Sequence, residues 1–170
     1  MYQVGDLIIY GGEGVCRVEA VGPSPVRGSN PGRLYYTLAP MYRSGLIYAP
    51  TDVRVPMRPI LTEGEAWELI RRIPEMNSSF EASCNSREAA LQYKNLLQTY
   101  EERNLLCLIR SIYCKNQRAI AQGKGYGRTE EHYLKRAQEL LHGELAVSLN
   151  IPVEQVEETI ARTLESQAER

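Results

Sequence analysis

The sequence predicts an α+β protein, a small Tudor- or SH3-like five-stranded β-barrel followed by an all-α helical domain. Over the first 60 residues, five short apolar or alternating runs are separated by turns rich in glycine, proline and serine, which is typical of a strongly bent barrel. After residue 60 the apolar residues recur at the spacing of amphipathic helices. We therefore expect a barrel over residues 1–60, a connecting helix and linker over 61–84, and a helical domain over 85–170.

The barrel is expected to begin with a hairpin whose turn is rich in glycine, because glycine tolerates the positive backbone angles of a tight reversal. In the second strand, alternation places Cys16, Val18 and Ala20 on one face. Pro56 confines the last strand to a sheet edge or a bulge, because proline lacks the N–H that a central strand needs. The five expected strands cover residues 7–10, 15–21, 34–39, 46–49 and 53–57.

The connecting helix is predicted from a capping box, in which Thr62 and Glu65 exchange hydrogen bonds at the first turn. Pro74 is expected to stop this helix. The next helix is expected to begin at a cap formed by Asn85 or Ser86. Its predicted apolar face consists of Ala89, Tyr93, Leu96 and Tyr100.

Three further amphipathic helices complete the predicted bundle. The first covers about residues 102–121 and ends before Gly123, a residue suited to the position just past a helix end. Thr129 is expected to cap the second helix, and Asn150 to end it. Pro152 is expected to be the first residue of the last helix.

Basic side chains are concentrated between residues 103 and 129, where six Lys or Arg residues occur without any acid, although the formal net charge of the chain is −1. Such a stretch is compatible with a surface that faces a polyanion such as DNA. A solvated basic helix face has the same composition. Composition alone leaves both interpretations open.

The sequence contains no recognisable catalytic or phosphate-binding motif, so we expect a protein that is not an enzyme and uses no cofactor, metal or small-molecule substrate. His132 and His142 lie ten residues apart on one expected helix, too far to share a metal ion directly. The glycine-rich segment 123–127 lacks the ending of a phosphate loop and is interpreted as a connection between helices. A deep pocket that combines either histidine with a carboxylate would reopen the enzyme class.

The four cysteines form no C-x-x-C pair, and no apolar stretch approaches the ~20 residues of a membrane span. The N-terminal residues lack the basic-then-apolar pattern of a signal peptide. We therefore expect a reduced, cytoplasmic protein without disulfides, a cysteine zinc site or a membrane partner.

The barrel offers two candidate binding features. Its tyrosines could form an aromatic cage for a methylated amine, although filling strand positions is the ordinary role of tyrosine. These tyrosines are Tyr10, Tyr35, Tyr36, Tyr42 and Tyr48. The other feature is a charge-free run that is the best candidate for an open sheet edge, to which a partner's strand could add. This run is Leu46, Ile47, Tyr48 and Ala49.

Two sets of short strings occur in a defined order along the chain. The first set is Val4-Gly5-Asp6-Leu7-Ile8-Ile9-Tyr10, Gly14-Val15-Cys16-Arg17-Val18, Leu34-Tyr35-Tyr36, Tyr48-Ala49-Pro50 and Met57-Arg58-Pro59-Ile60. The second set is Tyr93-Lys94, Ile120-Ala121-Gln122-Gly123-Lys124 and Gly143-Glu144-Leu145-Ala146. Together they resemble the CarD family of bacterial transcription regulators, whose opening is similar to the polymerase-binding module of transcription-repair coupling factors.

The resemblance implies a Tudor-like module that binds the β subunit of RNA polymerase by strand pairing. It also implies a helical domain that makes weak, non-sequence-specific contact with promoter DNA and modulates open-complex formation. Arg27 is expected to compensate for a basic polymerase contact that relatives have near Ser24. The expected polymerase-binding residues are Arg27, Leu46, Ile47, Tyr48 and Ala49.

Lys94, Lys115 and Arg118 are the candidate phosphate contacts of the helical domain. The family's wedge tryptophan is replaced here by Ala89, and Phe80 is expected to substitute for it at the DNA fork. The alternative function is a protein–protein interaction adaptor without DNA contact. Salt distinguishes the two, because affinity that depends on phosphate contacts falls steeply as salt rises.

Overall fold

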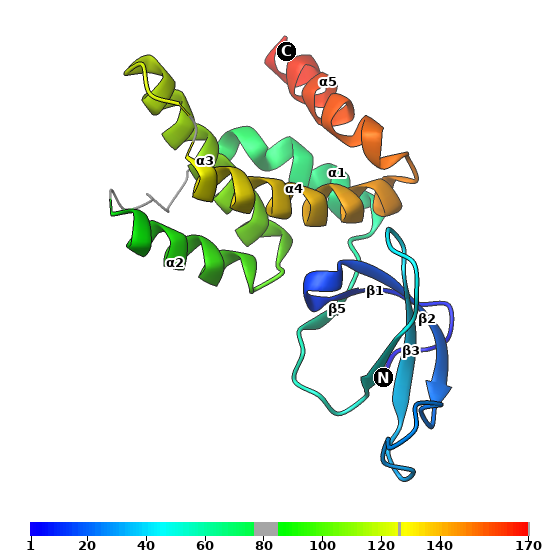
Figure 1. Ribbon diagram of the computed structural model, residues 1–170. Helices are drawn as coiled ribbons and strands as arrows, with labels where there is room; N and C mark the ends of the chain where they lie inside the picture. Colours follow the sequence, from blue (N-terminus) through cyan, green and yellow to red (C-terminus); the bar gives the residue numbers. More distant parts are fainter. Residues whose placement is uncertain (77–84, 126, 170) are drawn as a thin grey trace. The chain divides into compact units, whose positions relative to one another are not determined.

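The computed structural model describes residues 1–76, 85–125 and 127–169. These residues form two compact units, Met1–Ile60 and Leu61–Arg170 (Figure 1). Among the described residues, β-strands occur in the first unit and α-helices in the second, so the fold is α+β. We refer to the two as the sheet unit and the helical unit.

The sheet unit is built on one five-stranded antiparallel sheet, in the order β4-β3-β2-β1-β5. Five strands in one sheet are therefore confirmed, but the sheet is open and a closed barrel is not confirmed. The strands are β1 (Leu7–Tyr10), β2 (Val15–Gly22), β3 (Tyr35–Pro40), β4 (Ile47–Pro50) and β5 (Met57–Pro59). The β1–β2 turn is a short 3₁₀ helix, η1 (Gly11–Glu13), with positive φ angles of 44° at Gly11 and 74° at Gly14.

β5 begins at Met57, so the strand expected over 53–57 is placed too early. The residues before Pro56 connect β4 to β5 without joining the sheet, and the Pro56 carbonyl accepts from the Gly11 N–H at 2.9 Å. Arg58, opposite Ile9, supplies the N–H that pairing with β1 requires, whereas Pro56 and Pro59, on either side of Met57 and Arg58, have no N–H to donate. β5 lies at a sheet edge, as expected, although Pro56, on which the expectation rested, precedes the strand.

The alternation of β2 changes at a β-bulge. The register with β3 shifts between Val18 and Ala20, where Glu19 is an extra residue. One extra residue reverses which of the following side chains face the core. Cys16 and Val18 are buried as expected, whereas Ala20 is exposed and its expected placement is wrong.

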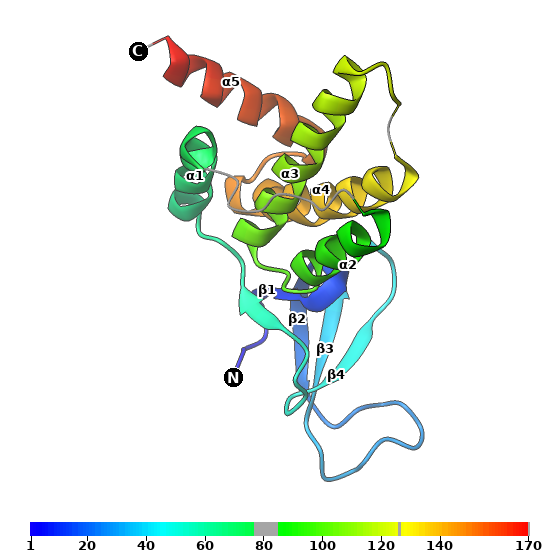
Figure 2. The same cartoon turned by 90° about the vertical axis from the view of Figure 1, so that its left-hand side faces the viewer.

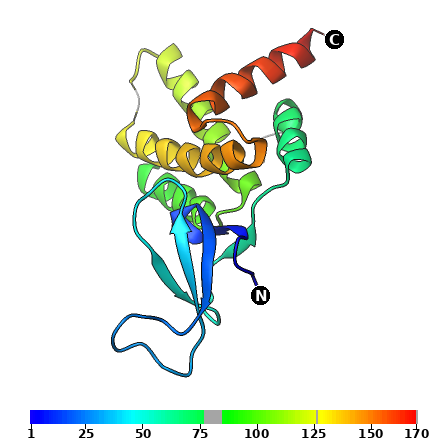
Figure 3. The same ribbon diagram turned by 90° about the vertical axis from the view of Figure 1, so that its right-hand side faces the viewer.

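A small apolar core covers one face of the sheet. Its buried members are Ile8, Cys16, Val18, Tyr36, Leu38 and Ala49. Ala49 on β4 and Met57 on β5 belong to the same cluster, so the sheet curves around it and both end strands are anchored by side-chain packing. The loop between β2 and β3, residues 23–34, projects from the end of the sheet (Figures 2 and 3).

The helical unit contains five α-helices and two short 3₁₀ helices among its described residues. They are α1 (Glu63–Arg72), η2 (Ile73–Glu75), α2 (Ser86–Leu97), α3 (Glu102–Ala121), α4 (Arg128–Leu149), η3 (Val153–Gln155) and α5 (Val156–Ala168). α3 and α4 cross at the centre of the unit (Figure 2). All five α-helices contribute buried residues to one core, and α1 belongs to it through Ala66, Leu69 and Ile70.

Several helix boundaries follow the expected local signals. The capping box is confirmed: the Glu65 N–H donates to Thr62 Oγ1 at 3.3 Å, and the Thr62 N–H donates to the Glu65 carboxylate at 2.8 Å. Asn85 Oδ1 caps α2 by accepting from two N–H groups of the first turn. Gly123, with φ 74°, ends α3 as expected and donates to the Ile120 carbonyl at 2.9 Å.

Three expected helix positions are wrong. α2 ends at Leu97, and Tyr100 lies in the following turn in the left-handed conformation, with φ 53°. Thr129 lies inside the first turn of α4, because Gly127 is the N-cap and its missing side chain leaves room for the Glu130 carboxylate. Pro152 has an extended ψ of 143° and precedes η3, so α5 begins only at Val156.

Candidate docking edge and helical polar cluster

β4 lies at one end of the sheet, where it pairs with β3 and with no other described strand. In the register, Ala49 lies opposite Tyr36 and Ile47 opposite Leu38, so these side chains share the core face. Tyr48 lies opposite Thr37 on the other face and is half-buried. β4 is therefore an edge strand of the kind that a strand from another chain can extend.

Alternate residues of β4 direct their backbone groups outward. Just after β4, the Thr51 N–H donates to the Leu34 carbonyl at 3.0 Å. Hydrogen-bonded pairs alternate along an antiparallel ladder, so Ala49 and Ile47 direct their N–H and C=O groups toward β3. Tyr48 directs both of its groups to the outer edge, and the proline that ends β4 has no N–H to add.

The structure brings four of the five expected polymerase-binding residues together. Ile47, Tyr48 and Ala49 belong to β4, and Leu46 directly precedes it with 53% of its surface exposed. Ala49 is buried, so it supports the edge from the core side. Arg27 lies elsewhere, on the exposed loop between β2 and β3.

Exposed apolar side chains flank β4 at both ends, and among them only Leu46 is a residue that the sequence predicts for this edge. Met41, Tyr42 and Leu46 are exposed in the connection that leads into β4. Leu34 and Val53 are exposed at the opposite end, where the chain enters β3 and leaves β4. The spacing of these residues along the sequence does not predict a shared surface, because only the pairing of β3 with β4 brings residues 34 and 53 to the same end of β4.

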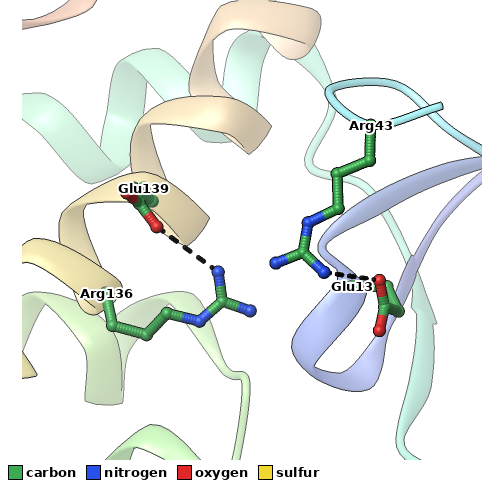
Figure 4. Close-up of polar contacts among 4 residues, drawn as sticks. All are labelled: Glu13, Arg43, Arg136 and Glu139. Atoms are coloured by element: carbon green, nitrogen blue, oxygen red, sulfur yellow. Dashed lines mark hydrogen bonds and ion pairs between the residues drawn. The ribbon is translucent and has the colours of Figure 1, made fainter.

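Two exposed ion pairs hold the chain segments on either side of β4, one at each end of the strand. Arg43 pairs with Glu13 at 3.1 Å (Figure 4). Arg33 pairs with Asp52 at 2.7 Å, and its hydrogen bond lowers the pKa of the Asp52 carboxyl. These contacts orient the loops beside the edge while leaving their charges at the surface.

β5 forms the other edge of the sheet and is more protected. It has three residues and ends in Pro59, and Pro56 precedes it. Arg58 directs its backbone groups toward β1, so Met57 provides the one outward N–H of the strand. Flanking prolines and short length are the features that protect sheet edges from pairing. β4 is therefore the better docking edge.

In the helical unit, a polar cluster joins α2, α3 and α4. Lys115 Nζ pairs with Glu130 Oε1 at 2.7 Å and lies 5.9 Å from the centre of the Tyr93 ring. Burial opposes ionisation of Glu130, but the hydrogen bond and charge of Lys115 outweigh it and lower the Glu130 pKa. Burial also raises the pKa of Tyr93. The charge of Lys115 is thus matched by a carboxylate inside its own unit.

The remaining candidate DNA contacts are distributed over the helical unit. Lys94 is exposed on α2, and Arg118 is exposed on α3. Arg110, from the same basic stretch, donates to the carbonyls of Ile73 and Met76. Phe80 lies outside the described residues.

Two of the five tyrosines considered for an aromatic cage, Tyr36 and Tyr10, belong to the core of the sheet unit instead. Tyr36 is buried in the sheet core with its ring 6.0 Å from that of Tyr2, and Tyr10 packs against the same core. Burial raises the pKa of the Cys16 thiol, also in this core, to about 11. These residues fill strand positions, as the alternative interpretation of the tyrosines requires.

His142 lines a cavity of about 480 Å³ in the helical unit together with Cys114 and Glu157, a combination that raises the enzyme class again. Among the described residues, no hydrogen bond joins these three side chains. The part of the chain that the structure describes also holds no group of three or more metal-ligating side chains.

These observations define an α+β protein whose sheet has an accessible edge strand, β4, and whose helical unit contains a partly buried polar cluster. No described helix has the length and apolar character needed to cross a membrane. Neither the known protein-family models nor the curated proteins include a match to this chain.

Proposed function

We propose that this chain is a non-enzymatic transcription regulator whose sheet unit is a Tudor- or SH3-like module that binds the β subunit of RNA polymerase. The observation that carries the proposal is the outer edge of β4, where Tyr48 directs its N–H and C=O groups away from β3. Strand addition obtains its affinity from such main-chain groups and its specificity from the flanking side chains. The string Tyr48-Ala49-Pro50, part of the family resemblance, lies on this strand.

The surroundings of β4 support this docking mode. Exposed apolar side chains lie at both ends of the strand, including Met41 and Leu46 at one end and Val53 at the other. A partner strand that pairs with Tyr48 would place its own flanking side chains over them, and burial of such apolar area stabilises association. The edge would therefore combine a short main-chain match with two apolar contacts.

The helical unit would modulate promoter opening through phosphate contacts. Lys94 and Arg118 are exposed and are suited to weak, non-sequence-specific binding. Lys115 would first have to release its 2.7 Å ion pair with Glu130 before it could contact a phosphate. Phe80 stays a proposed wedge on the family resemblance alone.

A protein–protein adaptor without DNA contact is the second candidate. It is favoured by the internal engagement of two cations of the basic stretch, Lys115 with Glu130 and Arg110 with the carbonyls of Ile73 and Met76. DNA binding by the full chain should lose affinity steeply between low and physiological salt if phosphate contacts operate. Polymerase binding that persists while no salt-dependent DNA binding is seen would identify the adaptor.

The docking edge is tested by Tyr48→Pro in the full chain, with binding to purified RNA polymerase β subunit measured by interferometry. Tyr48 directs its N–H outward, so proline removes a group that the partner uses and leaves the β3–β4 ladder intact. We expect affinity to fall at least about tenfold, the effect of losing main-chain bonds and introducing a steric block at the edge. Unchanged affinity would contradict strand addition at β4.

Tyr48→Ala is the matched control, because it keeps the outward N–H and removes only the side chain. Strand addition predicts that Tyr48→Ala binds more tightly than Tyr48→Pro. Equal losses in both variants would instead assign the contact to the tyrosine ring. If the wild-type chain shows no binding to the β subunit at micromolar concentration, the polymerase assignment fails.

A further inference from the structure

The helical unit contains a cavity of about 480 Å³ between α1, α3, α4 and α5. Figure 2 shows these four helices. Leucine and isoleucine side chains provide most of its lining, and those of its floor are buried. The buried floor residues include Ile70, Leu106, Leu141 and Leu145. Tyr113 and Cys114, both exposed, lie at its mouth on α3.

α5 closes the cavity only in part. Val156 is the one residue of α5 that is buried, while Ile160 and Leu164, which line the cavity, are only half-buried. The near end of α5 is held by Val156 in the common core, and its far end by the 3.4 Å hydrogen bond from Gln167 Nε2 to the Arg71 carbonyl. α5 is therefore attached at both ends, while the apolar side chains Ile160 and Leu164 in its middle face the cavity.

Few polar groups reach this space. Gln138 and His142 lie one turn apart on α4 and line the same wall. Burial lowers the pKa of His142, and the charge of Glu157 only partly opposes this, so the imidazole is neutral near pH 7 and offers one donor and one acceptor. Arg110 also lines the cavity, but its guanidinium donates to the carbonyls of Ile73 and Met76.

The volume and the lining indicate the kind of ligand. Cavities that bind drug-sized ligands span about 300–1,000 Å³, are mostly apolar and have a few convergent polar groups. The cavity has the size and lining of such a site.

We propose that this cavity binds an uncharged, largely apolar small molecule that carries one hydrogen-bonding group for His142 and Gln138. The apolar body of the ligand would lie against the buried leucine and isoleucine floor. An anionic ligand is disfavoured, because transfer of an ion into such an apolar space is costly without a counter-charge, and Arg110 already donates to two carbonyls. Glu157, the one carboxylate of the lining, is exposed and therefore lies away from the buried floor that would hold the body of the ligand. This inference does not depend on the docking edge of β4.

A second cleft of the helical unit has a mostly charged lining, in contrast to this apolar cavity. Its volume is about 350 Å³, and five of its eight lining residues are charged. Glu65 is used by the helix cap, and Glu68 pairs with Arg72 at 2.5 Å. The charged side chains Glu65, Glu68 and Arg72 of that cleft therefore contact other groups of the chain. The larger cavity, of about 480 Å³, has a mostly apolar lining instead.

The proposal is tested with Nile red, an uncharged apolar dye with a carbonyl acceptor, added to the full-length protein. We expect saturable binding of one dye per chain, with enhanced fluorescence. Cys114→Trp places an indole at the mouth of the cavity and should weaken binding at least tenfold. Gln117→Trp, also on α3 but outside the lining, is the matched control and should bind the dye as the wild type does.

A third variant tests the polar wall. His142→Leu replaces the imidazole with an apolar side chain of similar size and should weaken binding by about fivefold, the effect of one neutral hydrogen bond. Circular dichroism and thermal melts establish that each variant folds. Dye binding that is non-saturable, or that is equal in Cys114→Trp and Gln117→Trp, would overturn the proposal.

The oligomeric state of the protein tests whether a second copy of the chain covers the cavity. Sedimentation velocity should show a monomer over the concentrations at which the dye saturates. Self-association that eliminates dye binding would show that a second copy of the chain covers the cavity, which would also overturn the small-molecule assignment. None of these measurements involves polymerase, so failure here leaves the proposed function untouched.

Discussion

In the sheet unit, the ion pairs Arg33–Asp52 and Arg43–Glu13 lie at the surface, and an edge strand directs backbone groups outward. In the helical unit, by contrast, carboxylates enter the interior: Glu130 is 8% exposed and Glu144 only 1%. A surface ion pair is screened by water and contributes little to stability, whereas a buried carboxylate is stable only with partners in place. Both units have surface ion pairs, but among the described residues only the helical unit buries carboxylates.

The difference implies different sensitivities. The sheet unit should tolerate changes of charge and respond strongly to changes of its backbone pairing. The helical unit should respond to the loss of single carboxylates, because each leaves a donor without its partner. The edge of the sheet is thus suited to association, and the polar interior of the helices to holding a defined packing.

The largest expected effect is on the stability of the sheet unit, and it comes from proline substitutions at two adjacent residues within β4, Ile47 and Tyr48. Ile47 directs its N–H to β3, so Ile47→Pro removes a ladder hydrogen bond and should destabilise the sheet unit by about 3 kcal/mol. Tyr48→Pro affects only the outer edge and should cost less than about 1 kcal/mol. Urea denaturation of both variants measures the difference. Equal destabilisation would show that the assignment of inward and outward groups is wrong.

The next effect concerns Glu144 on α4, whose Oε1 accepts from the Leu61 N–H at 3.0 Å. Glu144→Ala leaves that donor without the carboxylate and should lower the free energy of unfolding by about 2 kcal/mol. Glu144→Gln keeps an oxygen acceptor of similar shape and should cost less. Urea denaturation compares the two variants with the wild type, and a larger loss for glutamine than for alanine would contradict this role.

A pH-dependent effect distinguishes the helical unit further. The Glu130 pKa is lowered from its ordinary value of 4.5 in the folded state, so its contribution is present above about pH 4.5 and is lost as the pH falls through the folded pKa. Glu130→Gln should cost about 1 kcal/mol at pH 7. The gap between wild type and variant should narrow as the pH falls below about 4.5 in urea titrations. A gap that is independent of pH would exclude the ion pair with Lys115 as its cause.

Local signals in the sequence predict much of this fold. Strand-length runs, turn residues and caps are read within a few neighbouring positions, and the capping box at Thr62 and the end of α3 at Gly123 are confirmed for that reason. The bulge at Glu19 is not local in this sense. It exists only in the register of β2 against β3, so alternation alone placed Ala20 on the wrong face.

The candidate sites show the same limit. The run from Leu46 to Ala49 was recognisable as an edge because it is continuous and free of charge. The pairing of Lys115 with Glu130 joins two helices across 15 positions, and no spacing rule connects them. The cavity beside His142 likewise arises from the packing of four helices, which the sequence does not specify position by position.

The smallest expected effect returns to the surface of the sheet unit. Arg33 and Asp52 form a 2.7 Å ion pair, but both side chains are solvated, with 37% and 63% exposure. Arg33→Ala should therefore leave the thermal midpoint of the full chain unchanged within error, because exposed ion pairs are screened and their ordering is entropically unfavourable. If the sheet unit binds the polymerase β subunit as proposed, the same variant should alter that binding only modestly, since the proposed contact is made by the Tyr48 backbone. A clear drop in the thermal midpoint would show that the sheet unit, like the helical unit, depends on its charges, and the contrast between the two would fail.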